Sequence, residues 1–119
     1  MTGRVKLLDH AESVLEGKID LGSSGPRTAA LLVRCALEEW LDEHSKSWAS
    51  GRYPFPSTRS KLVVLEVLGD RGLGARARRM WDALSRLVHH HAYELQPSVA
   101  EVRELVQQVR QLDDSAPSS

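Results

Sequence analysis

The sequence predicts an all-α fold, a bundle of five helices, from three observations. The chain has 119 residues, a length that suits one compact domain, and 41% of them are hydrophobic, which is typical of a globular protein. Proline, glycine and serine divide it into five stretches in which apolar residues recur every three or four positions. No two segments alternate apolar and polar residues as paired strands would. We therefore expect short connections and mostly antiparallel neighbours.

A polar, glycine-rich loop separates the first two predicted helices. Residues 3–16 carry Val5, Leu8 and Leu15 at helical spacing. After the loop, Pro26 suits the first turn of the second helix, because an N–H group at that position would have no intrahelical partner. The apolar residues that follow obey the i, i+3, i+4, i+7 rule. They are Ala29, Leu32, Val33, Ala36, Leu37, Trp40 and Leu41.

The third predicted helix spans residues 58–68 and follows a loop over 50–56 that contains two prolines. The β-branched pair Val63 and Val64 would also suit a strand. A lone strand cannot form a sheet, and no partner strand is found elsewhere in the chain. We therefore predict a helix here.

Three glycines between positions 69 and 74 predict a break before the fourth helix, which we place over 75–93. One stripe of this helix is apolar and is expected to face the core. The stripe comprises Ala77, Met80, Trp81, Leu84, Leu87 and Val88.

A capping box marks the start of the fifth predicted helix, where Ser98 is followed three residues later by Glu101. Residues 1–113 are expected to form the helical domain, and 114–119 a disordered polar tail. We expect side chains from different helices to be buried together in one core. The expected members are Leu37, Trp40, Trp81, Leu84 and Leu105.

Charge and cysteine content exclude several classes of protein. The 16 basic and 16 acidic residues cancel, so the chain is not coated in positive charge like a histone, although a local basic groove remains compatible with this balance. The single cysteine, Cys35, cannot form an internal disulfide, and no CxxC pair exists to hold zinc. No apolar run approaches the roughly 20 residues that span a bilayer, and the first residues lack the apolar core of a secretory signal. We expect a cytoplasmic protein with no membrane partner.

The segment 86–93 carries the residues best suited to chemistry. Arg86 and His91 form an Arg-x4-His string near the end of the fourth predicted helix. Together with Arg34 on a long second helix and the continuation His-Ala-Tyr, this string resembles HEPN domains, small helical bundles found in nucleotide-binding and ribonuclease contexts. The resemblance covers residues 3–112. It implies a metal-independent endoribonuclease, of the toxin or phage-defence effector type, whose two Arg–His pairs meet across a homodimer.

Cleavage of RNA without a metal needs a base for the 2′-hydroxyl proton and a cation for the phosphate charge. Histidine and arginine supply these roles. Helix geometry places Arg86 about 40° from His90 and about 140° from His91 around the axis. Periodicity therefore favours His90, whereas the resemblance favours His91. We predict Arg86 and His91 as catalytic residues, with His90 as the alternative.

Structural interpretations of the same residues remain open. Arg86 could pair with Asp82, four residues earlier on the same helix. Three consecutive histidines fan out by about 100° each around a helix, so they cannot converge on one ion, and we expect no metal and no cofactor. Trp48, beside a predicted loop, is a candidate for stacking on bases.

A cluster of arginines precedes the histidines, and we predict that it binds RNA phosphates. Between Arg71 and His91 the one acidic residue is Asp82. The alternative is a solvated face neutralised by acids elsewhere, such as Glu38, Glu39, Asp42 and Glu43. The predicted RNA-binding residues are Arg71, Arg76, Arg78 and Arg79.

Two functions follow from these features. The arginine cluster and the Arg-x4-His string favour an endoribonuclease with RNA as substrate, and such proteins pair with an antitoxin. Zero net charge favours a non-catalytic interaction module that docks a larger effector protein. Leu87 favours the same module, because HEPN ribonucleases usually carry a polar residue directly after the arginine.

Overall fold

The computed structural model describes residues 3–49, 57–68, 71–89 and 98–115, which form five α-helices and one short 3-10 turn. The described residues contain no strand, so the all-α prediction is confirmed, including the helix at 58–68. The helices are α1 (Gly3–Leu15), α2 (Gly25–Ala49), α3 (Thr58–Leu68), α4 (Arg71–Val88) and α5 (Val99–Ser115), and the 3-10 turn is Gly22–Ser24.

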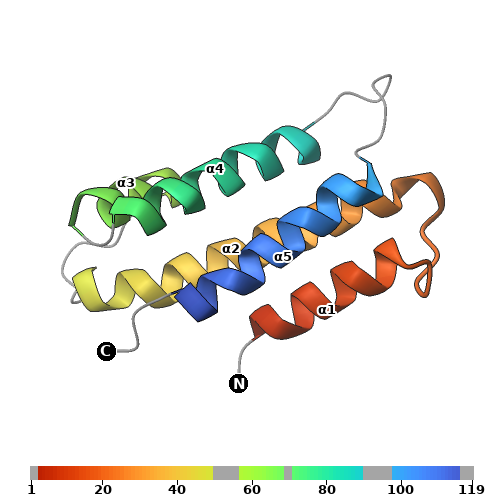
Figure 1. Ribbon diagram of the computed structural model, residues 1–119, viewed down its shortest axis with the longest axis horizontal. Helices are drawn as coiled ribbons and strands as arrows, with labels where there is room; N and C mark the ends of the chain where they lie inside the picture. The colour runs from red at the N-terminus through yellow and green to blue at the C-terminus, as the bar shows by residue number, and fades with distance from the viewer. Residues whose placement is uncertain (1–2, 50–56, 69–70, 90–97, 116–119) are drawn as a thin grey trace.

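The longest helix, α2, is the centre of the bundle and packs against all four others. α3 and α4 form a hairpin along one side of α2, while α1 and α5 run along the other (Figure 1). α4 also contacts α5, so these two helices border a shared surface. None of the helices, over the residues described, is long and apolar enough to cross a bilayer.

The core is one cluster of apolar side chains contributed by all five helices. The core prediction is confirmed for Leu37, Trp40 and Leu84, which are fully buried, and for Leu105, which is 6% exposed. It is wrong for Trp81, which is half-buried. The Trp81 ring packs against this cluster, and the guanidinium of an arginine on α2 lies over the ring.

The predicted glycine break before the fourth helix is also wrong in part. α4 begins at Arg71, so Gly72 and Gly74 lie inside the helix. A Cβ atom at Gly74 would lie 2.7 Å from the Cα of Glu66 on α3, closer than two carbon atoms can approach. Glycine is therefore needed for the close crossing of α3 and α4 and does not end the helix. At its other end α4 stops at Val88, and residues 90–97 lie outside the described residues.

Local contacts fix the ends of the bundle. The Ser98 hydroxyl oxygen accepts the backbone N–H of Glu101 at 3.0 Å, which confirms the predicted cap of α5. α5 continues through Ser115, past the expected start of the tail, and residues 116–119 lie outside the described part of the chain. Between α1 and α5, Arg110 pairs with Asp9 at 2.9 Å and with Glu12.

Candidate functional site

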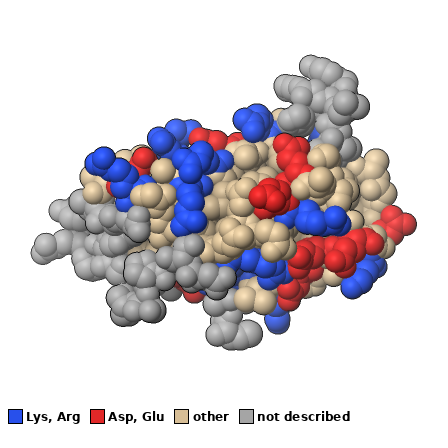
Figure 2. Space-filling view, viewed as in Figure 1, with Lys and Arg blue, Asp and Glu red and all other residues tan. Residues whose placement is uncertain are grey.

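Five arginines project from the solvent side of α4, and we call them the arginine face. The apolar residues of α4 line its opposite side, from Leu73 to Leu87, so helical geometry turns the arginines outward. Figure 2 shows Lys and Arg side chains gathered over α4, whereas acids and bases alternate where α1 meets α5. The arginine face comprises Arg71, Arg76, Arg78, Arg79 and Arg86, all exposed.

The arginine face keeps most of its charge. Arg78 pairs with Glu66 of α3 at 3.6 Å. The other four arginines form no ion pair with any residue that the structure describes. In particular, Arg86 does not pair with Asp82 within the described chain, so the structural interpretation of Arg86 is not supported there. Four cations are thus open to an anionic ligand.

The acids proposed as alternative partners of these arginines are engaged by residues of α1 and α3. Glu38 accepts a hydrogen bond from Thr58, and Asp42 pairs with Lys61. Glu39 accepts the backbone N–H of Arg4, and Glu43 pairs with the Arg4 side chain. The buried Arg4 was not identified from the sequence, where it looks like an ordinary surface arginine of the first helix.

At the end of α4, three side chains from two helices come together. The guanidinium carbon of Arg34, on α2, lies 4.3 Å from the centre of the Trp81 ring. Nη1 of the same guanidinium lies 3.3 Å from Nε2 of His89. The buried Nε of Arg34 has no hydrogen-bond partner within the described chain. Stacking and one hydrogen bond therefore hold Arg34 against the C-terminal half of α4.

The contact with Arg34 indicates which nitrogen of the His89 ring accepts a hydrogen bond. A guanidinium has donors only, so Nε2 of His89 must accept this hydrogen bond and the ring proton must sit on Nδ1. The backbone N–H of His89 donates to the carbonyl of Ser85 at 3.0 Å, which continues the helical pattern of α4. Arg86 lies one turn before His89 on the exposed side. Two arginines and a histidine thus meet at this end of the helix.

The predicted catalytic histidines cannot be placed in this geometry. His90 and His91 lie outside the described residues, so the Arg86–His91 pair remains a prediction. Trp48 lies in α2, and its side chain is also outside the description. The role of Arg34 beside Trp81 was missed, because no sequence spacing connects α2 with α4.

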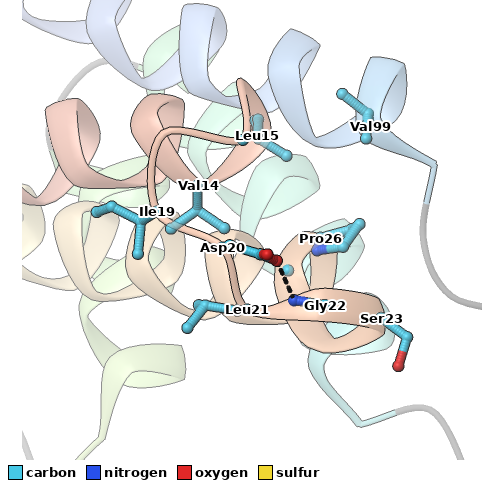
Figure 3. A pocket seen from close by; sticks show the side chains of 11 residues that line it. Val14, Leu15, Ile19, Asp20, Leu21, Gly22, Ser23, Pro26 and Val99 are labelled. Carbon is cyan, nitrogen blue, oxygen red and sulfur yellow. Dashed lines mark hydrogen bonds between the residues drawn. The ribbon is translucent and has the colours of Figure 1, made fainter.

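A cavity at the start of α2 does not suit phosphate chemistry. It has a volume of about 380 Å³ and lies between the end of α1, the start of α2 and Val99 (Figure 3). Its walls include Val14, Leu15 and Ile19. The Asp20 carboxylate accepts the backbone N–H of Gly22 at 2.9 Å and closes the turn there. This cavity offers apolar surface and no cation.

A smaller cavity, of about 230 Å³, belongs to the arginine face itself. It lies between α4 and α5, and we call it the α4/α5 groove. Its lining combines two cations, two amides and a thioether. The lining residues are Arg76, Arg79, Met80, Gln108 and Gln111.

Cys35 shows no sign of activation as a nucleophile. Burial and the nearby Glu38 carboxylate raise the pKa of its thiol, and the Arg34 guanidinium opposes them. Within the described ranges, no three His, Cys, Asp or Glu side chains come together as metal ligands.

No protein-family model, curated protein or solved structure matches the chain. The function must therefore be argued from the chemistry of the site.

Proposed function

We propose that this protein binds RNA through the arginine face of α4 and cleaves it without a metal ion. The observation that carries the proposal is the charge of that face. Four of its five arginines have no ion-pair partner among the described residues, although the chain as a whole has no net charge. Such local segregation of charge is typical of a surface that binds a polyanion.

The chemistry is proposed for the end of α4. Arg86 binds the phosphate of the cleaved linkage, and His91 removes the 2′-hydroxyl proton, with His90 as the alternative base. The 2′-oxygen then bonds to phosphorus, the bond from phosphorus to the 5′-oxygen breaks, and the 5′-oxygen leaves as a hydroxyl with a proton taken from water. Because Nε2 of His89 already accepts a hydrogen bond from Arg34, His89 is less suited to act as the base. Arg34 adds positive charge next to the same turn.

The resemblance to HEPN domains supports this assignment of roles. It also extends the proposal to a homodimer in which two Arg–His pairs meet, and to a toxin or phage-defence role with an antitoxin as partner. These features go together, because a composite site would require α4 to face a second copy of the chain.

The decisive experiment compares single substitutions in a cleavage assay with purified protein and RNA. Arg86→Ala and His91→Ala are each expected to abolish cleavage, while the melting temperature changes little because Arg86 is exposed. His89→Ala should have a mild effect. His10→Ala, an exposed histidine on α1, is the matched control and should leave cleavage unchanged. Cleavage should persist in EDTA and leave a 2′,3′-cyclic phosphate.

The opposite outcomes are equally clear. If both substitutions mainly lower the melting temperature, the Arg-x4-His string is a structural feature. If the parent protein leaves both structured and unstructured RNA intact, the ribonuclease proposal fails. Growth inhibition by the parent in cells, but not by Arg86→Ala, would support a toxin.

A second candidate function is a non-catalytic module that docks a larger effector protein. The observation in its favour is Leu87, which is 4% exposed and packs in the core. The position directly after Arg86 therefore cannot offer a polar group to a substrate. RNA that is neither bound nor cut would favour this module.

A further inference from the structure

The α4/α5 groove has the geometry of a small binding site. Arg76 and Arg79 lie one turn apart on α4, and Gln108 and Gln111 lie one turn apart on α5. Two cations therefore face two amides across the groove. The floor is Met80, which is 4% exposed and anchored in the core, so the groove has a fixed base.

The electrostatics of the groove favour an anion. Neither Arg76 nor Arg79 has an ion-pair partner in the described part of the chain. On α5, the Glu104 carboxylate accepts a hydrogen bond from the Gln108 amide at 3.3 Å. By contrast, the neighbouring cavity between α3 and α4 contains Asp82, and its Arg78 is paired with Glu66. The α4/α5 groove thus keeps both of its positive charges.

The size and donors of the groove narrow the chemistry of its ligand. Pockets that enclose drug-sized molecules have volumes of roughly 300–1,000 Å³. At about 230 Å³, the groove suits a phosphate with its sugar better than a whole nucleotide. Guanidinium groups bind phosphate oxygens in pairs, and glutamine amides can both donate to and accept from a ribose hydroxyl.

We propose that the α4/α5 groove is a phosphate-binding subsite for a single RNA strand, separate from the site of cleavage. The inference rests on the proposed function, because it takes RNA as the ligand. Arg79 lies seven residues before Arg86, which corresponds to about 10 Å along the helix. The groove therefore holds a phosphate that flanks the cleaved linkage. It contributes affinity, and it takes no part in the reaction.

The test measures binding of an uncleavable strand, a fluorescein-labelled decamer of 2′-O-methyl uridine, by fluorescence anisotropy at several salt concentrations. The double variant Arg76→Gln/Arg79→Gln is expected to bind about tenfold more weakly or worse at low salt. Each lost phosphate contact lowers the slope of log affinity against log salt by about 0.7, so the slope should fall by about 0.7 to 1.4.

Two controls isolate the groove from net charge. Arg59→Gln/Arg103→Gln removes the same charge from exposed positions on α3 and α5 outside the groove, and should leave the salt slope unchanged. Gln108→Ala/Gln111→Ala removes the amides without changing charge, so affinity should fall while the slope stays the same. Circular dichroism checks that each variant keeps its helices.

The outcomes separate this inference from the proposed function. Equal changes in slope for the groove variant and its charge-matched control would overturn the subsite and leave the ribonuclease proposal standing. If the groove variant shows the expected fall in slope relative to the parent but the parent cuts no RNA, the subsite is supported and the cleavage proposal is overturned. A parent that does not bind the strand would overturn both.

Discussion

At the scale of single residues, Arg34 shows how one side chain changes the role of its neighbours. The Trp81 ring lies on the apolar stripe of α4 and packs against the core, and the Arg34 guanidinium lies over it at 4.3 Å from the ring centre. Cation–π stacking of this kind contributes about 0.5–2 kcal/mol, depending on how far it is removed from water. The tryptophan thus serves as a platform that holds a cation beside His89.

Cys35 provides a prediction about pH dependence at this scale. Burial and Glu38 raise the pKa of its thiol, so less of the reactive thiolate exists at any pH below that pKa than for an ordinary cysteine. Alkylation of the folded protein by iodoacetamide should therefore be slow at neutral pH. Its rate should rise with pH, with a midpoint above that of the same thiol in guanidinium chloride. Equal midpoints in the folded and unfolded protein would contradict this expectation.

At the scale of elements, α4 is shaped by two neighbours at once. Its apolar side is buried against the core, and Gly74 allows the backbone of α3 to approach at the Glu66 position. The same packing turns the arginines toward solvent and leaves Arg76 and Arg79 beside α5. The position of the arginine face is therefore a consequence of how α4 is buried.

The close crossing of α3 and α4 can be tested with Gly74→Ala. Alanine normally stabilises a helix interior by about 1 kcal/mol relative to glycine. At Gly74 the new Cβ would lie 2.7 Å from the Cα of Glu66, so we expect the free energy of unfolding to fall by about 1–3 kcal/mol instead. Urea unfolding monitored by circular dichroism measures the change.

Gly72→Ala is the matched control, because Gly72 is exposed in the same helix. This substitution should raise the free energy of unfolding by about 0.5–1 kcal/mol, since Gly72 is exposed and alanine is favoured over glycine in a helix. If both substitutions stabilise the protein, α3 and α4 are farther apart than the structure indicates.

At the scale of the whole molecule, the bundle has α2 at its centre and leaves the outer surface of α4 uncovered within the described chain. A chain of about this size buries only about two-thirds of the surface that its unfolded form exposes. Assembly would add to that burial. The outer surface of α4 is thus the part of the bundle to which we assign the proposed RNA contact and the proposed dimer contact.

Light scattering at micromolar concentration tests this assembly. The proposed composite site requires a symmetric homodimer that buries part of α4, so the expected mass is twice the 13.3 kDa of one chain. A monomer of 13.3 kDa across that concentration range would contradict the dimer and remove the composite site. The RNA-binding subsite on a single chain would not be affected.

Local patterns in the sequence were sufficient to predict five helices and the cap of α5, although not every helix boundary. The periodicity at 58–68 outweighed the strand preference of Val63 and Val64, and Ser98 caps α5 as its spacing with Glu101 predicts. Both features depend on residues within a few positions of one another, where helical geometry is already set. The exposure of the arginines on α4 follows from the same periodicity.

Contacts between distant parts of the chain were decided by the tertiary structure alone. The sequence predicts that Gly74 breaks a helix, whereas in the structure it lies inside α4 and allows α3 to pack closely. The sequence also predicts that Trp81 is buried in the core, whereas in the structure it is half-buried beneath the Arg34 guanidinium. Likewise, the α4/α5 groove joins residues about 30 positions apart in the sequence. Periodicity determines which side of a helix is apolar, but the partner that covers each position depends on how the helices pack in three dimensions.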